Sequence, residues 1–220
     1  MDFAEARTRL IKYLSRDISD KRVLEVMEHI PRELFVPEDL KIYAYEDRPL
    51  PIGYDQTISQ PYIIALMTSA LELTGTENVL EVGTGSGYQA AILAELAAHV
   101  VTTERIPELA EKARKVLTDL GYRNVEVHLS KKDVLGWPEK SPYDAIIVTA
   151  GAPNIPDELL NQLNTGGKMV IPVGSRYLQE LCKITRLPEK NKIENLGGCH
   201  FVPLIGRGAW QSDNNQADTY

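Results

Sequence analysis

The stretch NVLEVGTGSGYQ, residues 78–89, decides the fold together with TTERIPEL at residues 102–109. The first reads as a short apolar strand, a glycine turn and the start of a helix, and the second as a strand that ends in Glu104. Gly83 and Gly85 have no Cβ, so the backbone there can turn tightly and approach a ligand closely. A carboxylate at the tip of the next strand can accept hydrogen bonds from both hydroxyls of a ribose. The pattern therefore predicts a site for a nucleoside-containing cofactor.

The glycine spacing separates the kinds of nucleoside cofactor. A dinucleotide site has the pattern G-x-G-x-x-G, with a helix N-terminus that faces a pyrophosphate. This loop instead reads G-x-G-x-G and follows the acid Glu81, which repels a pyrophosphate and suits a cationic ligand. S-adenosylmethionine is such a ligand, because it carries a sulfonium, an ammonium and a ribose but no phosphate. The alternative is a glycine turn that binds nothing, and the two acids Glu81 and Glu104 count against it.

Composition limits the class of protein. A hydrophobic content of 43% in 220 residues supports a sizeable core, and a net charge of −7 argues against a nucleic-acid surface. No apolar run approaches the length of a membrane span, and the charged N-terminus does not resemble a signal peptide. Cys182 and Cys199 lie apart without metal-ligand spacing, which is typical of reduced thiols. We therefore expect a cytoplasmic monomer with no bound metal and with neither nucleic acid nor membrane as a partner.

Strand and helix patterns alternate in the second part of the chain. The predicted strands are 79–82, 100–103, 125–129, 144–149 and 168–173, and the predicted helices are 88–96, 107–120 and 156–163. This alternation predicts a parallel sheet with helices on both faces. The runs 178–187 and 193–202, joined by PEKNK, predict an antiparallel hairpin. The expected fold is α/β: a Rossmann-like, doubly wound sheet of seven strands, mostly parallel, with a C-terminal antiparallel hairpin and an N-terminal helical extension.

The N-terminal part has helical periodicity and few strand signals. Apolar spacing predicts a helix over residues 2–15, and Asp20 is expected to cap a second helix that stops at Pro31. Residues 32–60 read as loops and short turns, and Pro61 opens another helix. A single domain, residues 1–220, would then contain a helical substrate-side segment (1–75), an α/β cofactor-binding core (76–210) and a disordered tail (211–220).

Six segments narrow the family. They are RPLPIGYDQTISQPYIIALMT (48–68), LEVGTGSGYQAA (80–91), ERIPEL (104–109), LGWPEKSPYDAIIVTAGAPNIP (135–156), GGKMVIPVG (166–174) and FVPLIG (201–206). Together they closely resemble protein-L-isoaspartate O-methyltransferases, which methylate isoaspartyl residues in damaged proteins. The block Q-T-I-S-Q-P is specific to that family. The resemblance implies a class I methyltransferase fold, S-adenosylmethionine as methyl donor, and damaged proteins and peptides as substrates.

The implied reaction needs no general base. The free α-carboxylate of an isoaspartyl residue attacks the methyl carbon in line, and S-adenosylhomocysteine leaves. At pH 7 that carboxylate is already deprotonated. Catalysis then comes mainly from holding the anion and the sulfonium in line with water excluded.

The resemblance also assigns residues. Ser59 is expected to donate its hydroxyl to the substrate carboxylate, and the alternative is an N-cap for the helix at Pro61. Thr57, Ile58 and Val202 are expected to shape the substrate groove beside Ser59. The predicted cofactor-binding residues are Glu81, Gly83, Thr84, Gly85, Ser86, Glu104, Arg105, Asp133 and Thr149. The two tryptophans, Trp137 and Trp210, are interpreted as packing residues.

One segment departs from the family pattern. The family has G-D-G before L-G-W, with an aspartate that reaches the adenine amino group, whereas this chain has Lys131, Lys132 and Asp133. A lysine only donates, so it cannot accept a hydrogen bond from an amine, and we expect Asp133 to take over. The departure favours one alternative, a non-catalytic binding module with a methyltransferase fold, which the intact Ser59 and Glu104 oppose. Another alternative is a related carboxyl methyltransferase with a different substrate.

Overall fold

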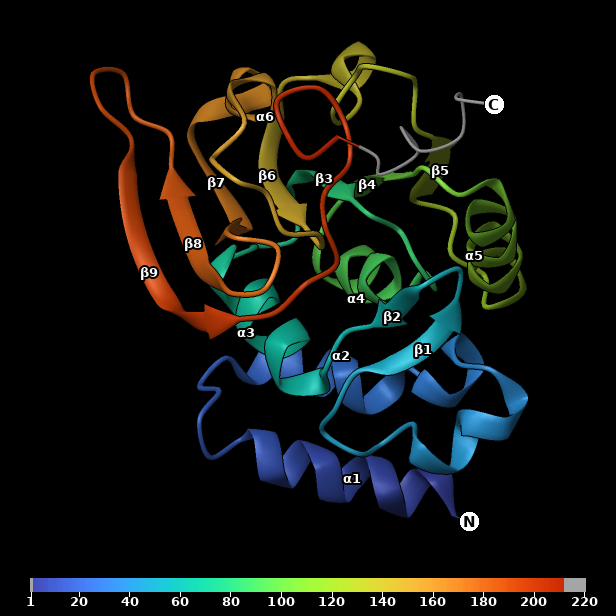
Figure 1. Cartoon of the computed structure of the whole chain (residues 1–220). Coiled ribbons are helices and arrows are strands. Elements are labelled where there is room, and N and C mark those ends of the chain that lie inside the picture. The colour runs from blue at the N-terminus through green and yellow to red at the C-terminus, as the bar shows by residue number, and fades with distance from the viewer. Residues whose placement is uncertain (1, 212–220) are drawn as a thin grey trace, which may run out of the picture.

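The central sheet has seven strands in the order β5-β4-β3-β6-β7-β8-β9, as Figure 1 shows. The structure is a computed structural model and describes residues 2–211. The strands are β3 (Asn78–Val82), β4 (His99–Glu104), β5 (Val125–Leu129), β6 (Tyr143–Val148), β7 (Leu163–Gly174), β8 (Gln179–Thr185) and β9 (Lys192–Cys199). The strands from β5 to β7 run parallel, whereas β8 is antiparallel to β7 and to β9. The predicted Rossmann-like sheet with a terminal antiparallel hairpin is confirmed.

Helices precede and connect these strands. Within residues 2–211 they are α1 (Phe3–Leu14), α2 (Lys21–His29), α3 (Pro61–Ala70), α4 (Tyr88–Leu96), α5 (Pro107–Asp119) and α6 (Asp157–Gln162), with 3-10 helices η1 (Arg32–Phe35), η2 (Glu38–Tyr43) and η3 (Pro138–Lys140). The predicted cap of α2 is confirmed, because the Asp20 side chain accepts hydrogen bonds from the amides of Arg22 and Val23. The helical N-terminal extension is therefore present as expected, and it packs below the sheet in Figure 1.

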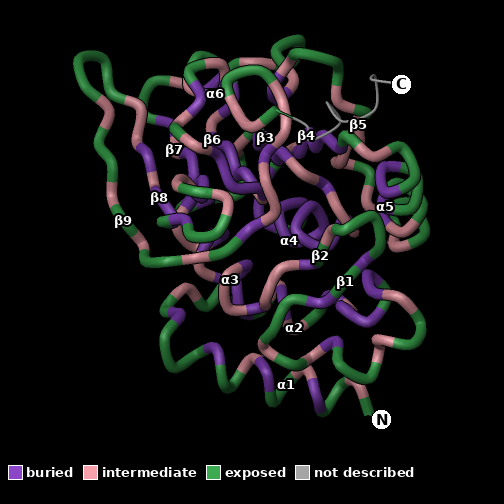
Figure 2. The backbone as a smooth tube through the Cα atoms, viewed as in Figure 1, coloured by how far each residue is buried: buried purple, intermediate pink, exposed green. Residues whose placement is uncertain are grey.

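Alternation along the strands separates two hydrophobic cores. Val79 and Ile147 pack in one core with α1 to α4, whereas Leu80 and Ile146 pack in the other with α6. Helices therefore lie on both faces of the sheet, as predicted. Figure 2 shows the result: the central strands and α4 are largely buried, while β9 and the outer turns are exposed. The strands that carry the predicted site at their ends thus belong to the buried core of the molecule.

The expectation of loops and turns over residues 32–60 is wrong for residues 50–58. There β1 (Leu50–Gly53) and β2 (Gln56–Ile58) form a separate antiparallel sheet of two strands. The turn between them consists of Tyr54 and Asp55, whose φ angles are 55° and 56°. Two successive positive φ angles are typical of a type I′ hairpin turn, which usually contains Asn-Gly or Asp-Gly. The dipeptide Tyr-Asp lacks that signal, so no local pattern indicates the hairpin.

Helix α3 begins at Pro61 as predicted, but Ser59 is not its cap. The N-cap position is Gln60, whose side chain makes no capping hydrogen bond. Instead the Asp47 carboxylate accepts hydrogen bonds from the Tyr62 amide at 2.8 Å and from the Gln60 side chain at 2.9 Å. An acid from outside the helix thus satisfies an amide of the first turn. The capping alternative for Ser59 is excluded, and its hydroxyl remains available.

Two further expectations concern the chain end and the membrane. The predicted disordered tail, residues 211–220, lies outside the described residues except for Gln211. None of the helices within residues 2–211 is long and apolar enough to cross a membrane.

Candidate active site

A cavity of about 590 Å³ opens at the carboxyl ends of β3, β4 and β6. Ligands in open α/β sheets bind at this edge, and the volume falls in the range of small-molecule sites. Its floor comes from the glycine loop after β3, and its other walls from the hairpin β1–β2, residues 130–136 and residues 202–207. Parallel register explains the floor, since Val82 lies beside both Thr103 of β4 and Val148 of β6. Segments far apart in the sequence therefore meet at one point.

The glycine loop has a backbone that only glycine tolerates. Gly83 has a φ of 103°, and a Cβ added there would lie 2.2 Å from the Thr149 Oγ1 atom. That hydroxyl donates to the Gly83 carbonyl at 2.6 Å and so ties the loop to the end of β6. Gly87 has a φ of 90° and forms the N-cap of α4. The pattern G-x-G-x-G is therefore required by the turn itself.

Glu104 holds the glycine loop from the neighbouring strand. One carboxylate oxygen accepts from the Gly85 amide at 2.8 Å, and the other accepts from the amides of Arg105 and Ile106 at 2.9 and 3.0 Å. The side chain is buried yet lines the cavity. Each carboxylate oxygen has two lone pairs, so the oxygen that meets only Gly85 keeps one for a ligand hydroxyl. The backbone bonds hold the carboxylate in place before any ligand arrives.

Glu81 is the one predicted cofactor residue that does not line the cavity. It is fully buried beneath the loop, and burial raises the pKa of its carboxyl to about 8, with the nearby Glu104 acting in the same direction. Thr102 donates to one of its oxygens at 2.5 Å, and Thr102 in turn hydrogen-bonds Thr84 at 2.6 Å. The other oxygen has no partner within residues 2–211. Hydrogen bonds through Thr102 and Thr84 thus connect Glu81 to the cavity. A cation bound in the cavity would favour the ionised form of Glu81.

Thr57, Ile58 and Ser59 lie on the opposite wall, at the end of the hairpin that the sequence did not reveal. The Ser59 hydroxyl makes no hydrogen bond within residues 2–211. Val202 completes this side, and its carbonyl accepts from the Gly151 amide at 2.8 Å. The cavity therefore places an uncommitted hydroxyl on one wall and acidic and amide groups on the other.

Asp133 lies in the third wall, in the loop that departs from the family pattern. It has a φ of 60°, a left-handed conformation that aspartate tolerates better than most residues. Its exposed carboxylate lines the cavity and makes no hydrogen bond within the described chain. Lys131 also lines the cavity, but its ammonium pairs with Glu139 and lies 4.5 Å from the ring centre of Trp137. The predicted Asp133 carboxylate is thus a free acceptor in this loop.

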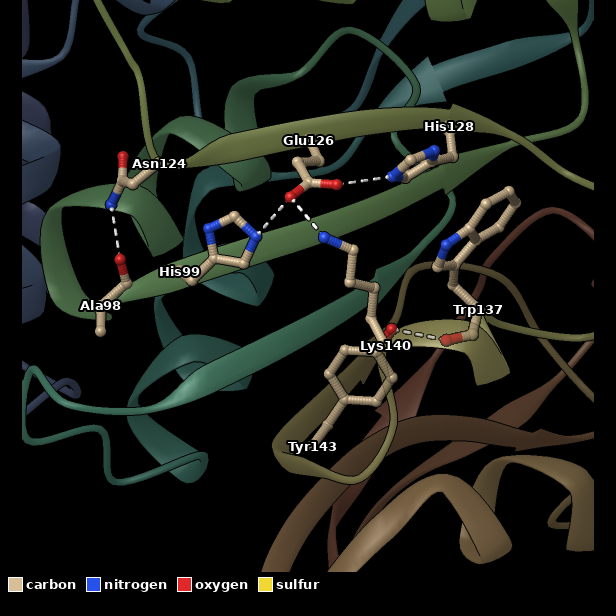
Figure 3. Close-up of polar contacts among 8 residues, drawn as sticks. All are labelled: Ala98, His99, Asn124, Glu126, His128, Trp137, Lys140 and Tyr143. Atoms are coloured by element: carbon tan, nitrogen blue, oxygen red, sulfur yellow. Dashed lines mark hydrogen bonds and ion pairs between the residues drawn. The ribbon is translucent and has the colours of Figure 1, made fainter.

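Figure 3 shows a polar cluster at the sheet edge. The loop of Asp133 contacts this cluster through Lys131, whose ammonium lies over the ring of Trp137. Glu126 of β5 contacts the imidazoles of His99 and His128 and the ammonium of Lys140, each at 3.0 Å. His128 stacks on Trp137 with the ring centres 4.1 Å apart. The three cationic or ring N–H partners hold the pKa of Glu126 below its usual range, with the Lys140 bond the largest cause. Because its ring stacks on His128, Trp137 is a packing residue, as expected.

Sequence reasoning missed several residues of the cavity. Trp210 was interpreted as a packing residue, yet it lines the cavity, as do Tyr88, Gln89 and Arg207. Tyr88 and Gln89 follow the glycine loop directly, so their place at the start of α4 is a signal that could have found them. Nothing in the local pattern around Trp210 marks it as a wall residue. Its position depends on the irregular segment after β9.

Comparison with known proteins decides the family. The family model described as protein-L-isoaspartate(D-aspartate) O-methyltransferase matches residues 5–209. The chain belongs to this family. It is 54% identical over 213 residues to protein-L-isoaspartate O-methyltransferase 1 of Syntrophobacter fumaroxidans, covering 96% of this chain and 99% of the relative. It is 52% identical over 216 residues to a protein-L-isoaspartate O-methyltransferase of Geobacter metallireducens, covering 97% of this chain and all of the relative.

Solved structures of protein-L-isoaspartate O-methyltransferases share the fold. One has a TM-score of 0.80 at 29% identity and covers 92% of this chain and 67% of its own. A second, a putative enzyme of this kind from Plasmodium falciparum in complex with S-adenosyl-L-homocysteine, has a TM-score of 0.76 at 25% identity. That match covers 88% of this chain and 95% of the Plasmodium chain. Each of these structural matches thus covers most of this chain.

Proposed function

We propose that this protein transfers a methyl group from S-adenosylmethionine to the free α-carboxylate of L-isoaspartyl residues in damaged proteins and peptides. The observation that carries the proposal is the pairing of two walls in one cavity. Gly85 and Glu104 form a nucleoside-binding wall, and Ser59, whose hydroxyl makes no hydrogen bond within residues 2–211, lines the same cavity. Membership of the protein-L-isoaspartate O-methyltransferase family supports the choice of substrate.

The residues present fit the cofactor. Glu104 can accept hydrogen bonds from ribose hydroxyls, and Asp133 offers the free acceptor that an adenine amine requires. The buried Glu81, with its unpartnered oxygen, would ionise in response to a cation bound above it, and its negative charge then suits a sulfonium or an ammonium. When bound, S-adenosylmethionine supplies an electrophilic methyl group, which the substrate carboxylate takes to form a methyl ester with release of S-adenosylhomocysteine.

Ser59 and its neighbours handle the substrate. The Ser59 hydroxyl donates a hydrogen bond to one carboxylate oxygen and transfers no proton, because the carboxylate is already ionised at pH 7. Thr57, Ile58 and Val202 shape the groove beside it. Holding the carboxylate in line with the methyl group raises the effective concentration of the two reactants, and it can lower the barrier by several kcal/mol.

The decisive experiment is transfer of labelled methyl from S-adenosylmethionine to a short peptide that contains one isoaspartate. The control peptide carries aspartate at the same position. We expect label only in the isoaspartyl peptide, and we expect base to release it as methanol, since the product is an ester. Binding of S-adenosylhomocysteine without any transfer would favour the non-catalytic module. Equal labelling of both peptides would favour a carboxyl methyltransferase of another specificity.

The proposal extends to the state and location of the protein. It includes a monomer as the functional unit. Cys182 and Cys199 are both free thiols, which supports the reducing cytoplasm as its location. Light scattering on the purified protein tests the first, and fractionation of the source cells tests the second.

A further inference from the structure

Arg32 is a fully buried arginine whose charge has no acid partner. It lies in η1 directly after Pro31, with none of its side chain exposed. None of the ion pairs within residues 2–211 includes it, and its Nη1 atom has no hydrogen-bond partner there. Burial lowers the pKa of the guanidinium to about 10, so it remains charged at neutral pH. An unpaired buried charge is costly and calls for a physical reason.

The guanidinium bonds both ends of the segment that carries the hairpin β1–β2. Its Nε atom donates to the Ala44 carbonyl at 2.8 Å, and its Nη2 atom donates to the Ser59 carbonyl at 2.8 Å. Ala44 ends η2, before β1, and Ser59 directly follows β2. A single side chain therefore ties together the two ends of the segment 44–59, which contains the hairpin. The planar, forked guanidinium can hold two carbonyls at once in this way.

The same guanidinium also contacts a wall of the cavity. Its Cζ atom lies 4.9 Å from the ring centre of Tyr88, which lines the cavity at the start of α4. The nearest acid whose field acts on Arg32 is Asp47, but both Asp47 oxygens already accept hydrogen bonds from Gln60 and Tyr62. Asp47 therefore acts on Arg32 only through its field and makes no ion pair with it, and the guanidinium is left to bond the two backbone carbonyls.

We propose that Arg32 is a positioning residue for Ser59: it fixes the serine backbone through the carbonyl and so sets where the hydroxyl meets the substrate carboxylate. The effect on substrate binding rests on the proposed function, whereas the effect on the Ser59 backbone rests only on the hydrogen bond from Arg32. Arg32 would act on substrate binding and leave the cofactor wall unchanged.

The test compares Arg32→Lys and Arg32→Met with the wild-type protein. Lysine keeps the charge but loses the fork, and methionine loses both. We expect KM for an isoaspartyl peptide to rise about tenfold for Arg32→Met and less for Arg32→Lys. The Kd of S-adenosylhomocysteine should change less than twofold in both. Hydrogen–deuterium exchange should accelerate in residues 44–60 and stay unchanged in β4, residues 99–104.

Arg22 provides the matched control, because its Nη1 atom also donates to a backbone carbonyl, that of Leu73, at 2.8 Å and away from the cavity. Arg22→Lys should alter neither KM nor exchange in residues 44–60. A double-mutant cycle of Arg32→Lys with Ser59→Ala should be non-additive, since the first acts through the second. Additive losses, or a KM unchanged in Arg32→Lys, would overturn the inference even if Arg32→Met does not fold.

The outcomes separate this inference from the proposed function. If the wild-type protein methylates the isoaspartyl peptide and Arg32→Lys matches it in KM and in exchange, only the inference is wrong. If the wild-type protein does not methylate the peptide, the proposed function is wrong. The exchange experiment then still decides whether Arg32 fixes Ser59.

Discussion

Two walls of the cavity are built in different ways. The cofactor wall, the glycine loop with Glu104, follows from the parallel register of β3, β4 and β6, which places the strand ends side by side. The substrate wall, the hairpin β1–β2 with the segment after β9, is irregular. It is held by single buried side chains: Arg32 donates to the Ser59 carbonyl, and Gln179 accepts from the Phe201 amide at 2.8 Å. Strand register thus sets most of the cofactor wall, although Glu104 and Thr149 also tie its loop. The substrate wall has backbone bonds at Gly151 but depends more on side chains from distant segments.

This difference predicts how each wall responds to substitution. A wall made by strand register is sensitive to changes that the backbone cannot accommodate, and it tolerates changes elsewhere. A wall held by side chains is sensitive to the loss of one hydrogen-bond donor or acceptor. Cofactor affinity and substrate KM should therefore respond to separate sets of variants.

The largest effect is expected for Gly83→Ala in the cofactor wall. The added methyl would lie 2.2 Å from the Thr149 hydroxyl at a φ of 103°, so both a clash and backbone strain oppose it. We expect affinity for S-adenosylhomocysteine to fall roughly 100-fold or more, since strain and overpacking each cost about 1–3 kcal/mol. Calorimetric titration measures the affinity, and thermal unfolding measures the accompanying loss of stability.

Gly75→Ala is the control for backbone strain alone. Gly75 has a φ of 110°, and an added Cβ meets nothing within 4 Å. The stability of the Gly75→Ala protein should fall by about 1–2 kcal/mol, and its affinity for S-adenosylhomocysteine should not change. Equal affinities in the two variants would mean that the contact with Thr149 does not shape the cofactor wall.

The next largest effect is expected for Ser59→Ala in the substrate wall. Removal of the hydroxyl leaves the substrate carboxylate without its donor, which should lower kcat/KM about 30-fold, or about 2 kcal/mol. Steady-state kinetics with the isoaspartyl peptide measure this loss. Affinity for S-adenosylhomocysteine should stay within twofold of wild type. A parallel loss of cofactor affinity would show that the two walls are not independent.

The two walls also differ in how far the sequence predicts them. Gly83, Gly85 and Glu104 could be placed because strand periodicity and glycine spacing are local signals that register then brings together. The β1–β2 hairpin could not be placed, since its turn uses Tyr54 and Asp55 in place of the usual glycine dipeptide. Ser59 entered through family resemblance, and no pattern of spacing leads to it.

Arg32 and Trp210 show the same limit. Arg32 stands 27 positions before Ser59, and their contact depends on how η1, η2 and the hairpin pack. Trp210 joins the cavity through the irregular segment after β9. Contacts of this kind are set by tertiary packing, so a single sequence without periodicity there does not reveal them.

A pH effect is expected from Glu81 beneath the cofactor wall. Burial raises its pKa from 4.5 to about 8, so the folded protein binds this proton more tightly than the unfolded chain does. Stability should therefore fall as pH rises from 4.5 to 8, by up to about 1.4 kcal/mol per pH unit. Denaturant titrations at several pH values should show this slope in the wild-type protein and its loss in Glu81→Gln. An identical slope in both would mean that Glu81 ionises normally.

The smallest effect is expected for Asp133, where the chain departs from its family. Asp133→Ala removes the free acceptor near the adenine position and should weaken S-adenosylhomocysteine binding about fivefold, or about 1 kcal/mol. Lys132→Ala should change the affinity less, because a lysine cannot accept from an amine.

Asp133→Gly sharpens the comparison, because it removes the carboxylate and also relieves the left-handed backbone at φ 60°. Stability should rise by up to about 1 kcal/mol while cofactor affinity still falls, as for the alanine variant. Calorimetry and thermal unfolding on the same samples separate the two quantities. Undiminished affinity in both variants would place adenine recognition in the backbone of the loop. The third wall would then resemble the cofactor wall, in which geometry and not a single side chain determines binding.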